Sequence, residues 1–252
     1  MIEYVFNGFV GMSNGDMGDG LQKTTLVDVI QKRHNVNLVE LDPSKAEIAP
    51  GIWVRYPHSN DWMSNPETTS RDQIMSLVIW TGYANRLDLL ERQFKEQVKR
   101  FGFYQNKLPI WPKADEPYKP WYTVDFASPE HWAQYIRSYY MITKNKWTYA
   151  LYPLIMATDL FMLGNSVITY FVSKFNTDHS DDDNAVLGMI QAYDSMDTPV
   201  AWAARRIYRK RTAPGSGEIK GIWAAIKYKH RKETGAPPIG ELFDYARVEE
   251  RF

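Results

Sequence analysis

Helix-start signals recur along this 252-residue chain and constrain its fold more than any other feature. Ser70 and Gln73 have the spacing of a capping box, in which two side chains bond free backbone N–H groups at the start of a helix. Ile74, Leu77 and Val78 follow at the spacing that gives a helix one apolar face. The sequence therefore predicts a buried amphipathic helix that starts at Ser70.

The same kind of signal precedes other segments. Asp19 and Gln22 repeat the capping-box spacing before an apolar pattern at 21–33. Ser128 and Thr198 are each followed by a proline, which is favoured at the first position of a helix. Acid-then-base pairs four residues apart support a helix at 86–100: Asp88 with Arg92, Glu91 with Lys95, and Glu96 with Arg100. Counted along the chain, these patterns predict eight or nine helices.

Strand signals are few. Residues 37–41 and 51–56 are the plausible strands, and two short strands form a hairpin rather than a sheet fold. Residues 1–20 are rich in glycine and are expected to be irregular. We therefore predict an all-α fold, with one helical domain over 1–252, a minor β-hairpin near 38–56, and helical hairpins in an arc or partial α/α toroid.

Two long segments need separate interpretation. At 102–128 prolines alternate with aromatic residues, which predicts a long ordered loop or lid. Residues 147–172 carry one formal charge, Asp159, so a membrane span is an alternative there. Polar residues, a proline and a glycine interrupt that stretch. We predict two core helices with a break near Gly164-Asn165, and no membrane span.

Composition excludes several classes. Lys+Arg and Asp+Glu are 30 each, so no net charge favours a nucleic-acid partner, and the basic patch at 205–211 is expected to be a solvated face. Cysteine is absent, which excludes a disulfide scaffold and thiolate chemistry. The first residues lack the pattern of a signal peptide, so a cytoplasmic or virion-associated location is expected. No motif indicates a cofactor. The nine Trp and sixteen Tyr serve either core packing or stacking on a ligand.

Acidic loops precede three of the predicted helices, and two explanations are open. Acids at helix starts bind free N–H groups and suit the helix dipole. Alternatively the loops converge on one cavity, where a carboxylate pair could hydrolyse a glycosidic bond. On that second interpretation the candidate catalytic residues are Asp19, Asp72 and Asp181. The candidate substrate-binding residues are Asp16, Trp53, His58, Asp61, Trp62, Arg71, Gln73 and Asp182.

Metal ligation is a second candidate for the acidic run at 178–183, which also contains His179. The run lacks both the H-E-x-x-H pattern and the spacing of an EF-hand loop. A run of Asp in a loop is usually solvated. We therefore assign no metal ligands.

Short motifs at 18–24 (Gly-Asp-Gly-Leu-Gln-Lys-Thr), 55–57, 70–73 (Ser-Arg-Asp-Gln), 181–184 and 237–239 resemble a pattern in uncharacterised phage and bacterial helical proteins. The layout also resembles α/α-toroid enzymes, whose acids lie at helix starts around a cavity. Toroid glycosidases usually have twelve helices and longer chains, so a complete barrel is not expected. The resemblance carries over no specific activity. From the acidic loops and the aromatic residues we expect a glycan-active hydrolase with a carbohydrate ligand. The alternative is a non-catalytic phage structural or interaction protein, whose aromatics would form an exposed patch and whose acids would be scattered.

Overall fold

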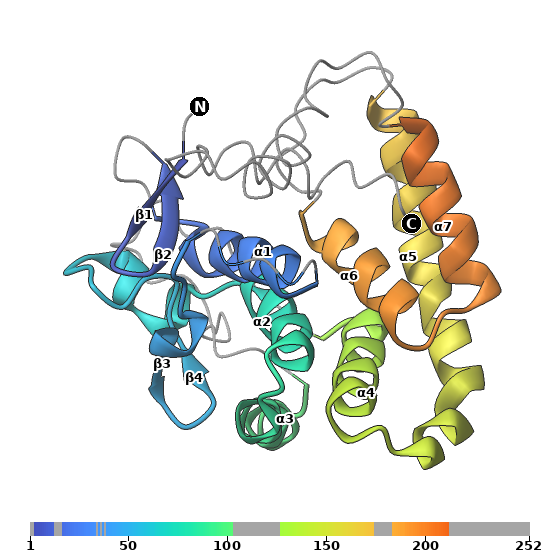
Figure 1. Ribbon diagram of the computed structural model, residues 1–252, viewed down its shortest axis with the longest axis horizontal. Coiled ribbons are helices and arrows are strands. Elements are labelled where there is room, and N and C mark those ends of the chain that lie inside the picture. Colours follow the sequence, from blue (N-terminus) through green and yellow to red (C-terminus); the bar gives the residue numbers. More distant parts are fainter. Residues whose placement is uncertain are drawn as a thin grey trace, which may run out of the picture.

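The computed structural model describes residues 3–12, 17–33, 35, 37, 39–102, 127–173 and 183–211. Within these residues the protein is mostly helical, with two small antiparallel sheets (Figure 1). The α-helices are α1 (Gly20–Arg33), α2 (Arg71–Tyr83), α3 (Leu87–Lys99), α4 (Pro129–Thr143), α5 (Tyr152–Ser173), α6 (Asp183–Asp194) and α7 (Pro199–Arg211). The strands are β1 (Glu3–Phe6), β2 (Phe9–Met12), β3 (Glu47–Ala49) and β4 (Ile52–Trp53), and short 3-10 helices span Pro43–Ala46, Trp62–Ser64, Pro66–Thr68 and Lys146–Leu151. The predicted all-α class is confirmed at this level.

Helices α1 and α2 lie side by side and run in the same direction. At their starts, Gln73 Nε2 donates a hydrogen bond of 2.7 Å to the carbonyl of Gly18. Further along both helices, Trp80 Nε1 donates one of 2.6 Å to the carboxylate of Asp28. Because early residues contact early residues and late contact late, the two helix starts lie at one end of the pair.

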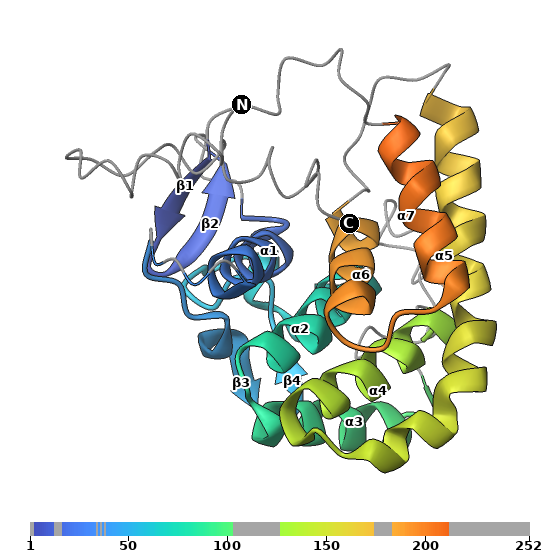
Figure 2. The same ribbon diagram turned by 45° about the vertical axis from the view of Figure 1, so that its right-hand side comes forward.

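Helices α4 and α6 follow the same direction. Ser138 Oγ on α4 donates 2.7 Å to the carbonyl of Val78 on α2, and Gln191 Nε2 on α6 donates 2.6 Å to Ser138 Oγ. At the far end, the Asp194 carboxylate on α6 pairs with Arg33 on α1. The starts of α1, α2, α4 and α6 therefore face one end of the molecule, while α3 and α5 return the chain between them and α7 lies along α5 (Figures 1 and 2).

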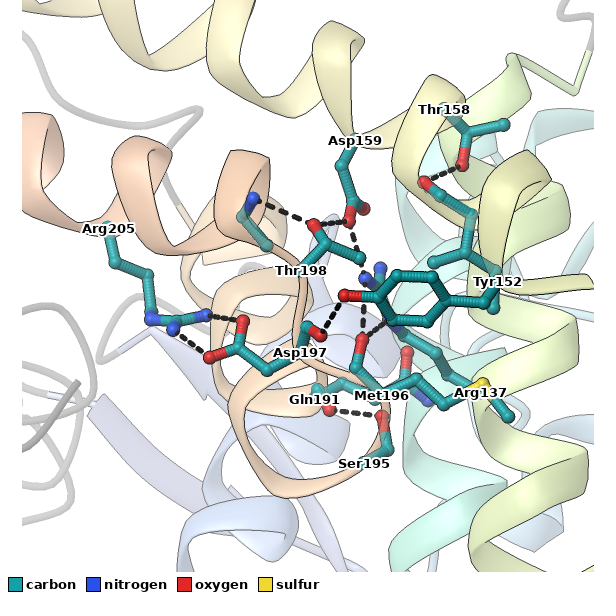
Figure 3. Close-up of polar contacts among 12 residues, drawn as sticks. Arg137, Tyr152, Thr158, Asp159, Gln191, Ser195, Met196, Asp197, Thr198 and Arg205 are labelled. Carbon is teal, nitrogen blue, oxygen red and sulfur yellow. Dashed lines mark hydrogen bonds and ion pairs between the residues drawn. The ribbon is translucent and has the colours of Figure 1, made fainter. Parts of the chain in front are cut away.

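A buried polar network fixes the junction between α6 and α7 (Figure 3). Arg137 of α4 and Asp159 of α5 form an ion pair of 2.8 Å in which both side chains are fully buried. Arg137 also donates to the carbonyl of Met196, and Thr198 Oγ1 donates to Asp159 Oδ2. This network fastens the 195–198 connection to α4 and α5, and so holds α6 in place against α4.

An N-terminal hairpin was not predicted. Residues 1–20 were expected to be irregular, yet β1 pairs with β2, with Val5 opposite Val10. The turn is Asn7-Gly8, and both residues have positive φ (51° and 85°). Asn-Gly favours such a turn because both residues tolerate left-handed backbone, so the hairpin has a local cause. The second hairpin, β3–β4, falls inside the predicted 38–56 region, but residues 39–41 are not a strand.

Helix α5 also differs from the prediction. It is continuous over Tyr152–Ser173, so the expected break near Gly164-Asn165 is wrong. A glycine inside a helix costs about 1 kcal/mol relative to alanine, which packing on α4 and α7 can offset. In the part of the chain that the structure describes, no helix has the length and apolar character needed to cross a membrane.

Two further predictions concern the ion pairs along α3 and the cap at the start of α2. All three predicted acid–base pairs form on α3, with separations of 3.4, 3.5 and 2.6 Å. Ser70 is the residue before α2, but its hydroxyl makes no capping bond, and the Gln73 side-chain amide donates to the carbonyl of Gly18. The capping-box spacing therefore predicted correctly where α2 begins, although the capping bond of the Ser70 hydroxyl does not form.

The predicted loop or lid at 102–128 lies mostly outside the described residues, which stop at 102 and resume at 127. At its base, the backbone N–H of Ala127 donates a hydrogen bond of 2.9 Å to the carbonyl of Gly102. The two ends of the segment are therefore adjacent.

Candidate functional site

Charged side chains gather where α2 and α4 begin. Arg71 and Asp72 occupy the first turn of α2 and form an ion pair of 3.3 Å, with each side chain about half exposed. Glu130 lies in the first turn of α4, and the charges of both Arg71 and Asp72 act on it. We call Arg71, Asp72, Glu130 and His131 the helix-start cluster.

Glu130 is the unusual member of this cluster. Its side chain is largely withdrawn from water, and this burial raises the pKa of the carboxyl group. The negative charge of Asp72 raises it further, while Arg71 and a hydrogen bond from Ser128 oppose the rise. The net effect is a raised pKa for Glu130, beside the half-exposed side chain of Asp72.

His131 closes the start of α4. The backbone N–H of Ser128 donates 3.1 Å to His131 Nδ1, so the imidazole caps the helix in place of the usual Glu or Gln. The ring is almost completely buried, and burial together with the charge of Arg71 lowers its pKa to about 3. The imidazole is therefore neutral near pH 7 and holds the backbone that carries Glu130.

A second group of predicted residues surrounds the loop before α1. The carbonyl of Gly18 accepts hydrogen bonds from Arg55 Nη1 (2.6 Å) and Gln73 Nε2 (2.7 Å). Asp19, about half exposed, lies 3.8 Å from the same guanidinium. The Arg55 guanidinium also lies 5.3 Å from the ring centroid of Trp62, whose side chain is half exposed. The structure thus brings Asp19, Trp62 and Gln73 together through Arg55, a residue that was not predicted.

Asp61 and His58 lie in the loop beside Trp62. Asp61 caps the short helix Trp62–Ser64 by accepting 2.8 Å from the backbone N–H of Met63. This bond and one from the Ser59 hydroxyl lower the pKa of Asp61, so it is ionised at neutral pH. His58 packs edge-on against Tyr56 and Phe9, with ring centroids 5.5 and 6.3 Å away.

The prediction that Trp53 binds substrate is wrong. Trp53 is fully buried in the main hydrophobic cluster and has no face open to solvent. The alternating pattern around Trp53 was correctly interpreted as a strand. Trp53 lies on the side of that strand that packs into the core. Trp62 remains the exposed ring in this region.

Three predicted residues, Asp16, Asp181 and Asp182, lie outside the described residues. Asp16 precedes α1 by four positions in the sequence, and Asp182 comes directly before α6. The acidic run at 178–183 that was weighed as a metal site falls largely outside as well. Among the described residues there is no group of three or more His, Asp or Glu arranged to hold a metal ion.

Sequence reasoning missed Glu130 and His131. Glu130 follows Ser128-Pro129, so it resembles any acid that complements a helix dipole. A further pattern, Gly-x-Ser-x-Gly at 11–15, begins in the last two residues of β2 and continues into residues 13–15, which lie outside the described residues, while α1 begins only at Gly20. A nucleophile elbow requires a sharp turn from strand to helix, so these residues do not support that assignment.

In this geometry two carboxyl groups, one of them with a raised pKa, and a guanidinium lie at neighbouring helix starts, with an exposed indole near the start of α1. Such a set can transfer a proton and orient a polar substrate. Comparisons of the chain with known protein families, with curated proteins and with solved structures gave no match.

Proposed function

We propose that this protein hydrolyses glycosidic bonds, with Glu130 as general acid and Asp72 as the carboxylate partner. The observation that supports the proposal is the raised pKa of Glu130 beside Asp72 at the shared end of α2 and α4. Hydrolysis of a glycoside needs one carboxyl that is protonated and one that is ionised. Different environments separate the two roles.

The proposed reaction is a displacement at the anomeric carbon. Glu130 donates its proton to the leaving glycosidic oxygen as the C–O bond breaks. Asp72 takes a proton from a water molecule whose oxygen bonds to the anomeric carbon. Arg71 orients Asp72 through their ion pair. The half-exposed ring of Trp62 supplies a stacking surface for a sugar, with Asp61 and Asp19 as acceptors for its hydroxyl groups.

The simpler explanation, in which these acids only complement helix dipoles, accounts for Asp19 and Asp72. It does not account for Glu130. A helix start favours the ionised form of a carboxylate and would lower its pKa. For Glu130 the pKa is raised, with burial as the largest cause and the charge of Asp72 adding to it, against the opposing effects of Arg71 and Ser128.

Asp181 and Asp182 lie outside the described residues, so their part in the site stays a prediction from the sequence. The shared direction of α1, α2, α4 and α6 supports an arc of helices whose starts line one end, as in a partial α/α toroid. Gln73 and His58 are positioning residues. Gln73 holds the loop before α1 through the carbonyl of Gly18, and His58 packs against Tyr56 in the loop that leads to Trp62.

The test is a screen for release of reducing ends from a panel of polysaccharides and peptidoglycan. Glu130→Gln and Asp72→Asn should each abolish the activity without lowering the melting temperature. Glu91→Gln, a half-exposed acid on α3, is the matched control and should remain fully active. The pH–rate profile should be bell-shaped. On its alkaline side the activity should fall as Glu130 ionises and can no longer donate a proton. Full activity in either site variant would refute the assignment.

A second candidate is a non-catalytic structural or interaction protein, as the sequence also allowed. The observation that favours it is the set of large apolar side chains exposed on α5 and on the 3-10 helix before it. A chain that cleaves no glycan in the screen but assembles through α5 would support this candidate over the hydrolase.

A further inference from the structure

Helix α5 presents an apolar face to solvent. Along one side of the helix lie Pro153, Leu154, Met156, Ala157, Leu160 and Phe161, all of them exposed. We call these six residues the α5 outer face. Leu160 is 57% exposed and Phe161 is 52% exposed. The opposite side of the helix carries the buried residues Ile155, Asp159 and Met162.

The α5 outer face carries no charge. Asp159 is the one charged residue in the sequence of α5, and it is turned inward to pair with Arg137. A nucleic acid or an acidic peptide would find no cationic side chain on this face. A partner must therefore present a surface that is equally apolar and uncharged.

The exposed area, counted on two copies, reaches the lower end of what a specific interface buries, about 1,200 Å² in total. Large exposed side chains continue from α5 into the preceding 3-10 helix, and those of both elements are 39–84% exposed: Trp147, Tyr149, Leu151, Leu154, Met156, Leu160 and Phe161. At about 150–200 Å² for a full side chain, they expose roughly 600 Å². A standard interface buries about 800 Å² on each partner, and monomers rarely expose an apolar patch above about 600 Å².

We propose that the α5 outer face binds a second copy of this chain, with the two α5 helices antiparallel. A two-fold interface places the same patch on both sides, which satisfies the need for an uncharged apolar partner. The chain has equal numbers of acidic and basic residues, so net charge does not oppose self-association.

The antiparallel arrangement follows from the residues along the helix. Lys144 and Lys146 are exposed just before α5, and an antiparallel pair keeps the lysines of the two copies at opposite ends. Ala157 and Gly164 are seven residues apart on one side, and a Cβ added at Gly164 would meet nothing within 4 Å. Small side chains on that side allow a second helix to approach closely.

The first experiment measures the mass of the full chain in solution over a range of concentrations. The wild type should be a dimer. Leu160→Asp should raise the dimer dissociation constant at least about tenfold, equivalent to about 1.4 kcal/mol. Because Leu160 is exposed, the melting temperature of the isolated subunit should not fall. Lys95→Asp on α3 is the matched control and should leave the dimer unchanged.

The second experiment uses the absence of cysteine in the chain. Under oxidising conditions Ala157→Cys should form a covalent dimer, because this position lies near the middle of the outer face. Lys95→Cys should not. A wild type that stays monomeric throughout would overturn the proposal. So would a monomer that binds neutral phosphatidylcholine vesicles through α5, or a chain that dimerises only after removal of residues 212–252, since each would assign a different occupant.

Discussion

Arg33 and Asp194 join the last residues of α1 and α6 through an ion pair of 2.7 Å. The hydroxyl of Tyr83, at the end of α2, donates 2.8 Å to the same carboxylate. One side chain thus ties three helix ends together. Because helices are stiff, fixing their ends also fixes how far each extends toward the site at their starts.

Asp194→Ala should lower the free energy of unfolding by about 1–2 kcal/mol, since hydrogen bonds to charged groups contribute more than neutral ones. For a chain of this size that corresponds to a fall of roughly 2–8 °C in melting temperature, measured by calorimetry. Asp88→Ala, whose partners Arg86 and Arg92 are more exposed, is the control and should lose about 0.5 kcal/mol or less. Equal losses in the two variants would show that Asp194 has no special role.

The buried pair of Arg137 and Asp159 should respond very differently to single and double substitutions. Asp159→Ala leaves a buried guanidinium without its counter-charge, which should cost about 3–5 kcal/mol. The double variant Arg137→Met, Asp159→Leu should be considerably more stable than the single one, because no buried charge remains. Urea denaturation of both variants would check this. A double variant as unstable as the single one would mean that shape, rather than charge, dominates the site.

Acid should destabilise the protein through His131. Its pKa is about 3 in the folded chain and near 6.5 when unfolded, so the unfolded state takes up a proton first as pH falls. The stabilising effect of the neutral ring is complete above about pH 6.5 and is lost as pH falls toward 3. The loss is about 1.4 kcal/mol for each pH unit in that interval. In a pH series of denaturant melts, His131→Asn should show a shallower dependence than the wild type over pH 4–6.5.

The pH dependence of stability that Glu130 contributes is opposite in sign to that of His131. Because its folded pKa is raised, the protonated carboxyl contributes stability that is lost as pH rises through that pKa. Glu130→Gln should therefore be at least as stable as the wild type at pH 8. A large loss of stability at that pH would make Glu130 a structural anion instead of an acid.

Two glycines should respond oppositely to alanine. Gly164 lies inside α5 with open space around it, so Gly164→Ala should stabilise the protein by about 0.5–1 kcal/mol. Gly51 has a φ of +75°, and an added Cβ would lie 2.8 Å from the carbonyl oxygen of Arg92. Gly51→Ala should therefore destabilise the hairpin and its contact with α3. Thermal melts of the two variants should shift in opposite directions.

The sequence was sufficient for features whose cause is local. The starts at Arg71 and Pro129 and the pairs on α3 follow from neighbouring residues, and they were predicted within one or two positions. The Asn7-Gly8 turn was equally local, and its hairpin was overlooked because glycines nearby suggested irregular structure. The continuity of α5 through Gly164 could not be predicted, because contacts with distant helices outweigh the local preference.

The site was harder to predict than the fold. Asp72 and Arg71 could be named from their position in a first turn. The importance of Glu130 depends on its burial in the folded chain, and no spacing in the sequence reports burial of one acid among many. Trp53 and Trp62 look alike in sequence, yet one is in the core and the other is half exposed.

The hydrogen bond between Ala127 and Gly102 has a consequence for how this chain can vary. Gly102 and Ala127 are hydrogen-bonded to each other, so the two ends between which residues 103–126 run are adjacent. A segment inserted in this way can be lengthened, shortened or exchanged while α3 and α4 keep their connection. The junction is therefore a natural place to graft foreign sequence, or to split the chain and rejoin its ends in a new order.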